Sequence, residues 1–189
     1  MTDWITWALV AVVIIGSIVV YLSSTAGRLD RLHHRIETAF AALDAQLLRR
    51  SAAAQDLASS GFLDPASSLL LSSAAQGTMV ADPVDTQVRA GAESELTRAL
   101  NAVFDDPEIV EEIREEAEPD QVLVDQLLAE LALACRRTEF ARRFHNDVVR
   151  SCTQLRRKRV CQWFRLAGHT AMPSTIDFDD TPPAALAEV

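Results

Sequence analysis

Residues 4–22 have the sequence WITWALVAVVIIGSIVVYL, which contains no charged side chain. As an α-helix this stretch is about 28 Å long, close to the roughly 30 Å hydrocarbon core of a bilayer. Trp4 and Trp7 lie near one end and Tyr21 near the other, where aromatic side chains meet the membrane interface. We therefore predict that residues 4–22 form a transmembrane helix that anchors the rest of the chain.

A cleaved signal peptide is the alternative interpretation of this stretch. Such a peptide has a positively charged start, a shorter apolar core and a small-residue cleavage site. Only residues 1–3 precede the apolar run and Asp3 is acidic, whereas residues 23–27 (SSTAG) resemble a cleavage site. The missing positive charge and the length of the run favour a retained anchor.

Basic residues beside a span set its orientation, because they are retained on the cytoplasmic side. None precedes Trp4, whereas Arg28, Arg31 and Arg35 follow the span. His33 and His34, next to these arginines, are expected to be solvated rather than metal-binding. The chain is thus predicted to be a single-pass protein of the cell membrane, with its N-terminus outside and its bulk in the cytoplasm.

The composition indicates an all-α protein. Ala and Leu are abundant, whereas the 189 residues include only 6 Gly and 7 Pro. Cys135, Cys152 and Cys161 are an odd number without CxxC spacing, so free thiols are expected rather than disulfides or a zinc site. The net charge of −9 argues against nucleic acid as a partner. No cofactor or metal ion is expected.

Apolar residues recur every three or four positions in three long segments, as they do on one face of a helix. The clearest stripe includes Val124, Leu128, Leu131 and Cys135. Helices with such stripes can bury their apolar faces only against one another, and Pro, Gly and Asp residues between the segments mark where the helices end. They predict an antiparallel bundle of three long helices plus a short acidic helix, with limits 28–60, 66–104, 107–117 and 121–160.

Two boundaries within this bundle depend on proline residues. We predict one broken helix at 66–104, in which Pro83 introduces a kink. Asp82 and Pro83 could instead cap a separate second helix, and the sequence does not decide between the two. Pro107 is expected to start the acidic helix. The predicted organisation is a short segment at residues 1–3, the transmembrane helix at 4–22, a cytoplasmic bundle over 28–170, and a C-terminal strap with a flexible tail over 171–189.

Two segments resemble signature motifs of the LemA family. They are IETAFAALDAQLLRR at residues 36–50 and TEFARRFHNDVVR at residues 138–150, in the expected order after an N-terminal span. The chain departs from the family pattern at His145, where an aromatic residue is usual, at residues 51–57, and at the basic run 156–159. The resemblance implies a membrane-anchored bundle of long antiparallel helices and no established activity.

Polar residues of these two segments would face each other if their helices pack. The candidate inter-helix polar cluster consists of Asp44, Gln46, Arg49, Asn146, Asp147 and Arg150, with Arg50 beside Arg49. These residues either fix the register of the helices or line the ligand pocket of a membrane-associated sensor or enzyme. No catalytic, phosphate-binding or metal-binding motif accompanies them, and His145 is expected to be a core residue. A non-enzymatic scaffold or interaction protein is therefore the function we expect.

Charge is concentrated in two opposed blocks. Residues 105–120 contain nine acids and one arginine, and residues 136–165 contain ten bases and two acids. The acidic block is expected to be a solvated connector, with a divalent-cation site as the alternative. In a three-helix bundle the end of the basic block lies about 50 Å from the bilayer, so we expect it to recruit an acidic protein partner or a second copy rather than lipid. The candidate interaction residues are Arg156, Arg157, Lys158, Arg159 and Arg165.

Overall fold

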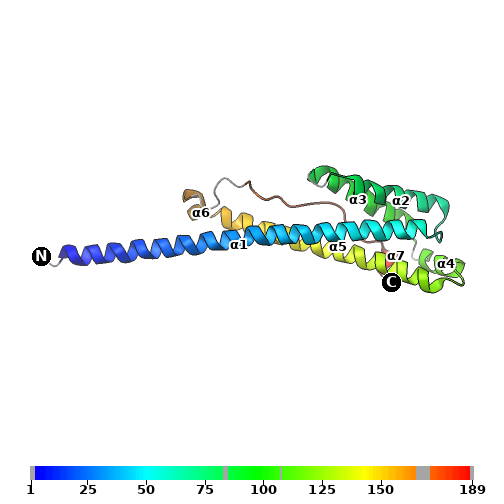
Figure 1. The fold of residues 1–189 in the computed structure, drawn as a ribbon, viewed down its shortest axis with the longest axis horizontal. Coiled ribbons are helices and arrows are strands. Elements are labelled where there is room, and N and C mark those ends of the chain that lie inside the picture. The colour runs from blue at the N-terminus through cyan, green and yellow to red at the C-terminus, as the bar shows by residue number, and fades with distance from the viewer. Residues whose placement is uncertain (1–2, 83–84, 107, 165–170, 188–189) are drawn as a thin grey trace. The chain divides into compact units, whose positions relative to one another are not determined.

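The computed structural model describes residues 3–82, 85–106, 108–164 and 171–187. No β-strand occurs among these residues, which confirms the predicted all-α class. The helices are α1 (Asp3–Ser59), α2 (Pro65–Val80), α3 (Thr86–Val103), α4 (Ile109–Glu116), α5 (Gln121–Arg156), α6 (Arg159–Trp163) and α7 (Ala184–Ala187) (Figure 1). Pro83, Pro107 and Arg165, for which the sequence predicted roles, lie outside the described residues.

The chain divides into two compact units. The anchor unit consists of residues 1–38 and 147–175, and the core unit consists of residues 39–146 and 176–189. The long helices α1 and α5 contribute residues to both units. The bundle limits of 28–170 stay a prediction.

The core unit is built on contacts between α1 and α5. The Thr138 hydroxyl donates to the Gln46 carbonyl at 3.3 Å, and the rings of Phe40 and His145 meet edge-on with centroids 6.0 Å apart. Earlier residues of α1 thus meet later residues of α5, so the two helices are antiparallel here. Their apolar stripes form one cluster with α2, α3, α4 and α7, in which each fully buried leucine contributes roughly 1.5–3 kcal/mol. The cluster includes Leu57, Leu71, Leu96, Leu100, Phe104, Leu128 and Leu186.

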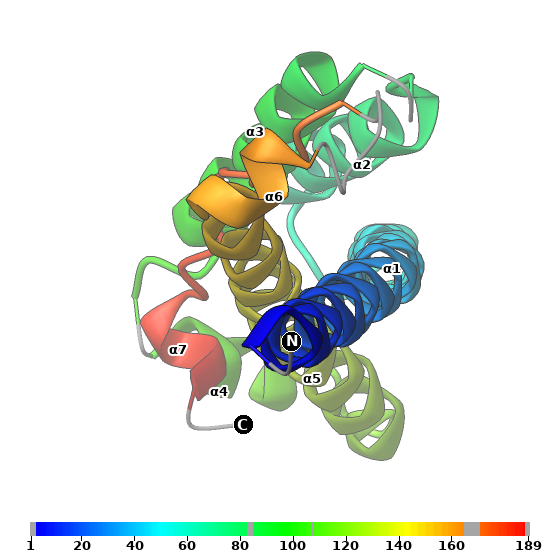
Figure 2. The same cartoon turned by 90° about the vertical axis from the view of Figure 1, so that its left-hand side faces the viewer.

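The middle region forms two helices rather than the one broken helix predicted at 66–104. Helices α2 and α3 pack side by side (Figures 1 and 2). Each begins at an aspartate, because the carboxylates of Asp64 and Asp85 accept hydrogen bonds from the first backbone N–H groups of their helices. Asp85, and not Asp82, is therefore the cap of α3.

The later elements follow the predicted order with shifted ends. The short acidic helix is α4, which buries Val110 and Ile113 in the core. The last long helix ends at Arg156 rather than at residue 160, and the five-residue α6 follows it. Part of the predicted flexible tail is packed, because Leu186 of α7 is 1% exposed and α7 contacts α4 (Figure 2).

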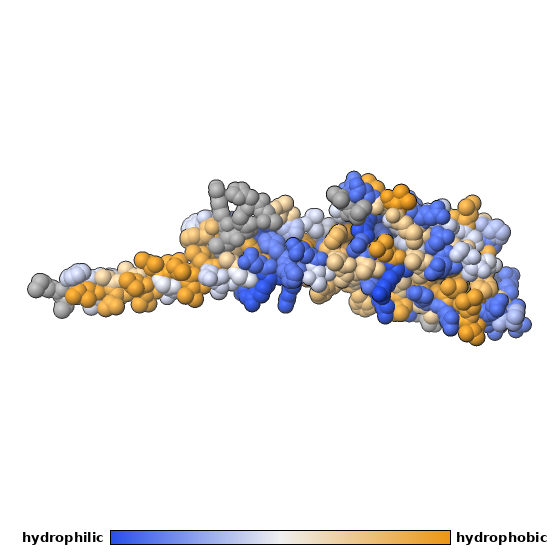
Figure 3. Space-filling view, viewed as in Figure 1, coloured by the Kyte–Doolittle hydropathy of each residue, from blue (hydrophilic) through white to orange (hydrophobic). Residues whose placement is uncertain are grey.

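The anchor unit contains the apolar span and a small core of its own. Within the described residues, α1 is the one helix long and apolar enough to cross a membrane, and none of its apolar stretch is buried. Figure 3 shows this stretch as a run of hydrophobic (orange) side chains. Beyond the span, Leu29 is buried in a cluster with Cys152, Leu155 and Cys161. The ends of α5 and α6 thus pack on the part of α1 that directly follows the span.

Candidate functional site

A buried ion pair is the main polar feature of the core unit. The Arg50 guanidinium donates to the Glu93 carboxylate at 2.5 Å, and both side chains are 2% exposed. It also donates to the Glu93 carbonyl and to the Thr97 hydroxyl, each at 3.1 Å. Burial raises the pKa of the Glu93 carboxyl, and the positive charge of Arg50 opposes that rise. Charge-assisted hydrogen bonds, shielded from water, therefore join α1 to α3.

Residues 176–181, here called the C-terminal strap, pack beside this ion pair. The Phe178 ring centroid lies 5.7 Å from Cζ of Arg50 and 5.5 Å from Cζ of Arg142. Arg142 on α5 donates to both carboxylate oxygens of Asp180, at 2.6 and 2.8 Å. The Thr97 hydroxyl lies 2.6 Å from the Asp179 carbonyl, to which it donates. Polar contacts thus fix the strap to both α3 and α5.

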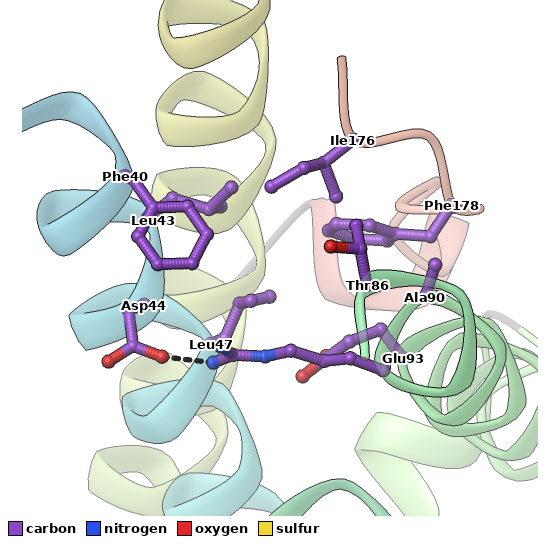
Figure 4. A pocket seen from close by; sticks show the side chains of 10 residues that line it. Phe40, Leu43, Asp44, Leu47, Thr86, Ala90, Glu93, Ile176 and Phe178 are labelled. Carbon is purple, nitrogen blue, oxygen red and sulfur yellow. Dashed lines mark hydrogen bonds and ion pairs between the residues drawn. The ribbon is translucent and has the colours of Figure 1, made fainter. Parts of the chain in front are cut away.

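The cavity between the strap and the helices is small. Its volume is about 10 Å³, which is room for about one water molecule. The side chains of Phe40, Leu43, Ile176 and Phe178 gather around it, and the dashed line in Figure 4 marks the ion pair that Asp44 makes. This place therefore offers polar groups but no volume for a metabolite-sized ligand.

Residues of the predicted inter-helix cluster have separate partners. Asp44 pairs with Arg89 on α3. The Asn146 side chain donates to the Ile176 carbonyl and accepts from the Ile176 backbone N–H, each at 2.9 Å. Gln46 meets α5 through its backbone carbonyl, whereas its side-chain oxygen is buried without a partner among the described residues.

The remaining members of that cluster lie on the surface. Arg49 is exposed, whereas Arg50 is buried, because helical rotation places residue 50 on the stripe of Leu43 and Leu47. Asp147 and Arg150 belong to the anchor unit, where they form an exposed ion pair at 3.0 Å. Within the core unit, Asp44 connects α1 to α3 and Asn146 connects α5 to the strap.

His145 and the three cysteines are buried. His145 is 3% exposed, its Nδ1 lies 3.3 Å from the Asn146 side-chain oxygen, and burial lowers its pKa. Burial raises the pKa of the Cys135 and Cys152 thiols, which keeps them protonated. In the described ranges, no three His, Cys, Asp or Glu side chains converge on a possible metal position, and this includes the described part of the acidic block.

The predicted basic end lies in the anchor unit, next to the arginines that follow the span. Arg157, Lys158 and Arg159 are exposed, and Arg156 donates to the Ala171 carbonyl at 2.7 Å. Lys158 and Arg28 line the same surface hollow of about 250 Å³. The predicted separation of about 50 Å assumed three helix passes, whereas the end of α5 lies beside the part of α1 that follows the apolar stretch.

The sequence reasoning missed Arg89, Glu93, Arg142, Phe178 and Asp180. Glu93 did carry a signal, because it lies on the same helical face as the apolar residues 96, 100 and 103, where an acid needs a buried partner. The strap residues Phe178 and Asp180 could not be found in the same way, because an extended segment has no helical periodicity.

No protein family model, curated protein or solved structure matches this chain. The two segments that resemble LemA motifs do contact each other in the core unit, through Thr138 with Gln46 and through Phe40 with His145. Membership of that family stays a prediction.

Proposed function

We propose that the protein is a membrane-anchored helical scaffold that holds other proteins at the cytoplasmic face, and that it is not an enzyme. The observation that carries this proposal is the apolar start of α1, a stretch long enough to cross a bilayer with none of it buried by the rest of the chain. Arg28, Arg31 and Arg35 directly after it favour a cytoplasmic body.

Exposure along the span supports the anchor. Leu9, Val12 and Ile15 are 61%, 67% and 60% exposed. Apolar surface left in water costs roughly 25 cal/mol per Å², and soluble proteins rarely expose a continuous patch of this extent. A bilayer removes that cost, which is the physical reason to place the span in one.

The filled interior of the core unit supports a scaffold over a sensor or enzyme. Asp44, Arg50 and Glu93 each have a protein partner, and the cavity beside them has a volume of about 10 Å³. Pockets for small molecules usually have volumes of about 300–1,000 Å³. Both ion pairs therefore act between α1 and α3 rather than on a ligand.

A row of exposed apolar side chains on α5 supports a protein-binding role. Leu133, Phe140 and Phe144 are 40%, 68% and 60% exposed. Their spacing of seven and four residues puts them on one helix face, which suits a helix of another protein or of a second copy.

Membership of the LemA family forms part of this proposal. Its support is the resemblance at residues 36–50 and 138–150 and the contact between these segments on antiparallel helices. The departures at residues 51–57 and 156–159 lie outside that contact, whereas the departure at His145 takes part in it through Phe40.

The anchor is tested by placing charge in the centre of the span. The double substitution Val12→Arg and Val13→Arg should move the protein from the membrane fraction to the soluble fraction, because each buried arginine costs about 2.5–3.5 kcal/mol at the bilayer centre. The matched control is Val80→Arg and Val122→Arg, since these valines are 84% and 71% exposed outside the span. Equal membrane retention of both variants in vesicle flotation would contradict the anchor.

The scaffold role is tested by proximity labelling of the full-length protein in intact cells. Replacing Phe140 and Phe144 with Ser should remove a defined set of labelled neighbours while membrane retention is unchanged. Leu69→Ser with Leu70→Ser is the control, because these α2 side chains are also exposed. The same neighbours with both variants would argue against the α5 surface as the binding face.

A further inference from the structure

The anchor unit carries a positive surface although the whole chain is acidic. Residues 28–38 and 147–164 contain eight bases and three acids, against a net charge of −9 for the chain. Two of these acids have partners, since Glu37 lies 3.6 Å from His34 and Asp147 pairs with Arg150. An excess of uncompensated positive charge remains.

Seven of these bases are exposed, and one of them, Arg150, pairs with Asp147. The other six form what we call the juxtamembrane basic surface: Arg28, Arg31, Arg35, Arg157, Lys158 and Arg159. Two neighbouring hollows connect its parts. Arg28, Arg31 and Arg35 line one, and Arg28 and Lys158 line the other, with Leu32 in both. Within the described part of the chain, no acidic side chain forms an ion pair with any of the six.

This surface lies close to the end of the span. Arg28 is six residues beyond Leu22, so its Cα lies about 9 Å further along α1. The headgroup layer extends about 5–8 Å beyond the hydrocarbon core, and long basic side chains reach toward it. Figure 3 shows hydrophilic (blue) side chains beyond the orange span, after a short pale stretch. Arg28 therefore reaches the headgroups, and Lys158 lines the same hollow.

Two aromatic side chains lie beside the basic run, at the last residue of α6 and the residue that follows it. Cys161 is buried in the same cluster as Leu29, which holds α6 against the part of α1 that follows the span. Trp163 and Phe164, by contrast, are 79% and 54% exposed. Exposed tryptophan next to arginine and lysine is typical of a surface that lies in a membrane interface.

We propose that the juxtamembrane basic surface binds the phosphate groups of anionic phospholipids in the same membrane that holds the span, with Trp163 inserted in the interface. Arginine side chains suit this role because the guanidinium donates two parallel hydrogen bonds to a phosphate. The contact fixes the anchor unit against the bilayer. This inference rests on the proposed anchor, and the experiment below separates the two.

The test uses the full chain with Trp4→Phe and Trp7→Phe, which leaves Trp163 as the single tryptophan. The protein is reconstituted into phosphatidylcholine vesicles with or without about 30 mol% phosphatidylglycerol, and Trp163 fluorescence is quenched by lipids brominated near the headgroup. We expect quenching at least about twofold greater in the anionic vesicles, reduced when salt shortens the screening length.

Charge-matched variants make the test specific. Arg157→Gln, Lys158→Gln and Arg159→Gln together should abolish the extra quenching in anionic vesicles. The control removes three exposed arginines of the core unit, with Arg49→Gln, Arg98→Gln and Arg137→Gln, and should behave as the parent protein. Circular dichroism should show the same helix content in both.

Three results would overturn the inference. Equal quenching in neutral and anionic vesicles, with the protein floating in both, would refute the lipid contact and leave the anchor standing. Failure to float with either vesicle would refute the anchor and the lipid contact together. A spectral shift of Trp163 that depends on protein concentration and not on lipid charge would mean that a second copy covers α6.

Discussion

Replacement of Arg50 by methionine should destabilise the core unit by about 3–5 kcal/mol, because the buried Glu93 carboxylate loses the positive charge that is hydrogen-bonded to it. Both side chains are 2% exposed, so water cannot replace the lost partner. Thr97 loses the Arg50 donor as well. For a domain of this size the loss corresponds to a fall in melting temperature of roughly 10 °C or more.

The assay is thermal unfolding followed by far-UV circular dichroism, on the full-length protein in detergent. Arg98→Met is the matched control, because Arg98 pairs with Glu95 where both side chains are more than half exposed, and such pairs contribute about 0–1 kcal/mol. Joint replacement by Arg50→Met and Glu93→Leu should recover most of the loss, since it removes both buried charges. An Arg50→Met variant as stable as Arg98→Met would refute the buried-pair reasoning.

The same variant should be sensitive to pH. Burial raises the pKa of Glu93 above its value in the unfolded chain, and removal of Arg50 raises that pKa further. The folded state then holds a proton that the unfolded state has lost, so stability falls as pH rises from about 4.3 through the folded pKa. The deficit of Arg50→Met relative to the unsubstituted protein should therefore be smaller near pH 5 than near pH 8.

Three further predictions concern single side chains. Asp180→Asn should weaken the two hydrogen bonds from Arg142 and lower the stability of the core unit by about 2 kcal/mol. Limited proteolysis should then cut the strap faster than in the control Asp177→Asn, because the Asp177 side chain is 75% exposed. Burial lowers the pKa of His145, so stability is lost as pH falls below about 6.5, and His145→Gln should flatten this dependence in pH-dependent melting curves. Hydrogen bonds from the Ser67 side chain and from the backbone N–H groups of Ser67 and Ala66 lower the pKa of the Asp64 carboxyl. The stability that Asp64 gives to α2 is therefore lost when acid protonates this carboxylate. Asp64→Asn should remove the acid sensitivity of the helix content measured by circular dichroism.

Local patterns in the sequence were sufficient for the helices. The stripe of Val124, Leu128, Leu131 and Cys135 predicted the buried face of α5, and all four residues are buried. An apolar stripe predicts the buried face because residues three or four positions apart lie on the same side of a helix, whichever element packs against it. The apolar run at 4–22 was likewise sufficient to predict an exposed helix long enough to cross a membrane.

The choice between one middle helix and two depended on tertiary contacts. The sequence pointed to Asp82 as the cap of a possible second helix, although Asp85, three residues later, has the same capping chemistry. The structure starts α3 after Asp85, where its stripe of Leu96 and Leu100 meets the core. This choice decided the number of helix passes, and with it the place of the basic end.

The sequence by itself determined which residues form helices, which faces of those helices are apolar, and which stretch can cross a membrane, because each of these properties depends on neighbours within a few turns. Tertiary structure alone decided the partners of the polar residues. Arg50 pairs with Glu93 and Asn146 with the strap because packing brings together positions 43 and 30 residues apart, and helical periodicity carries no information about such distances along the chain.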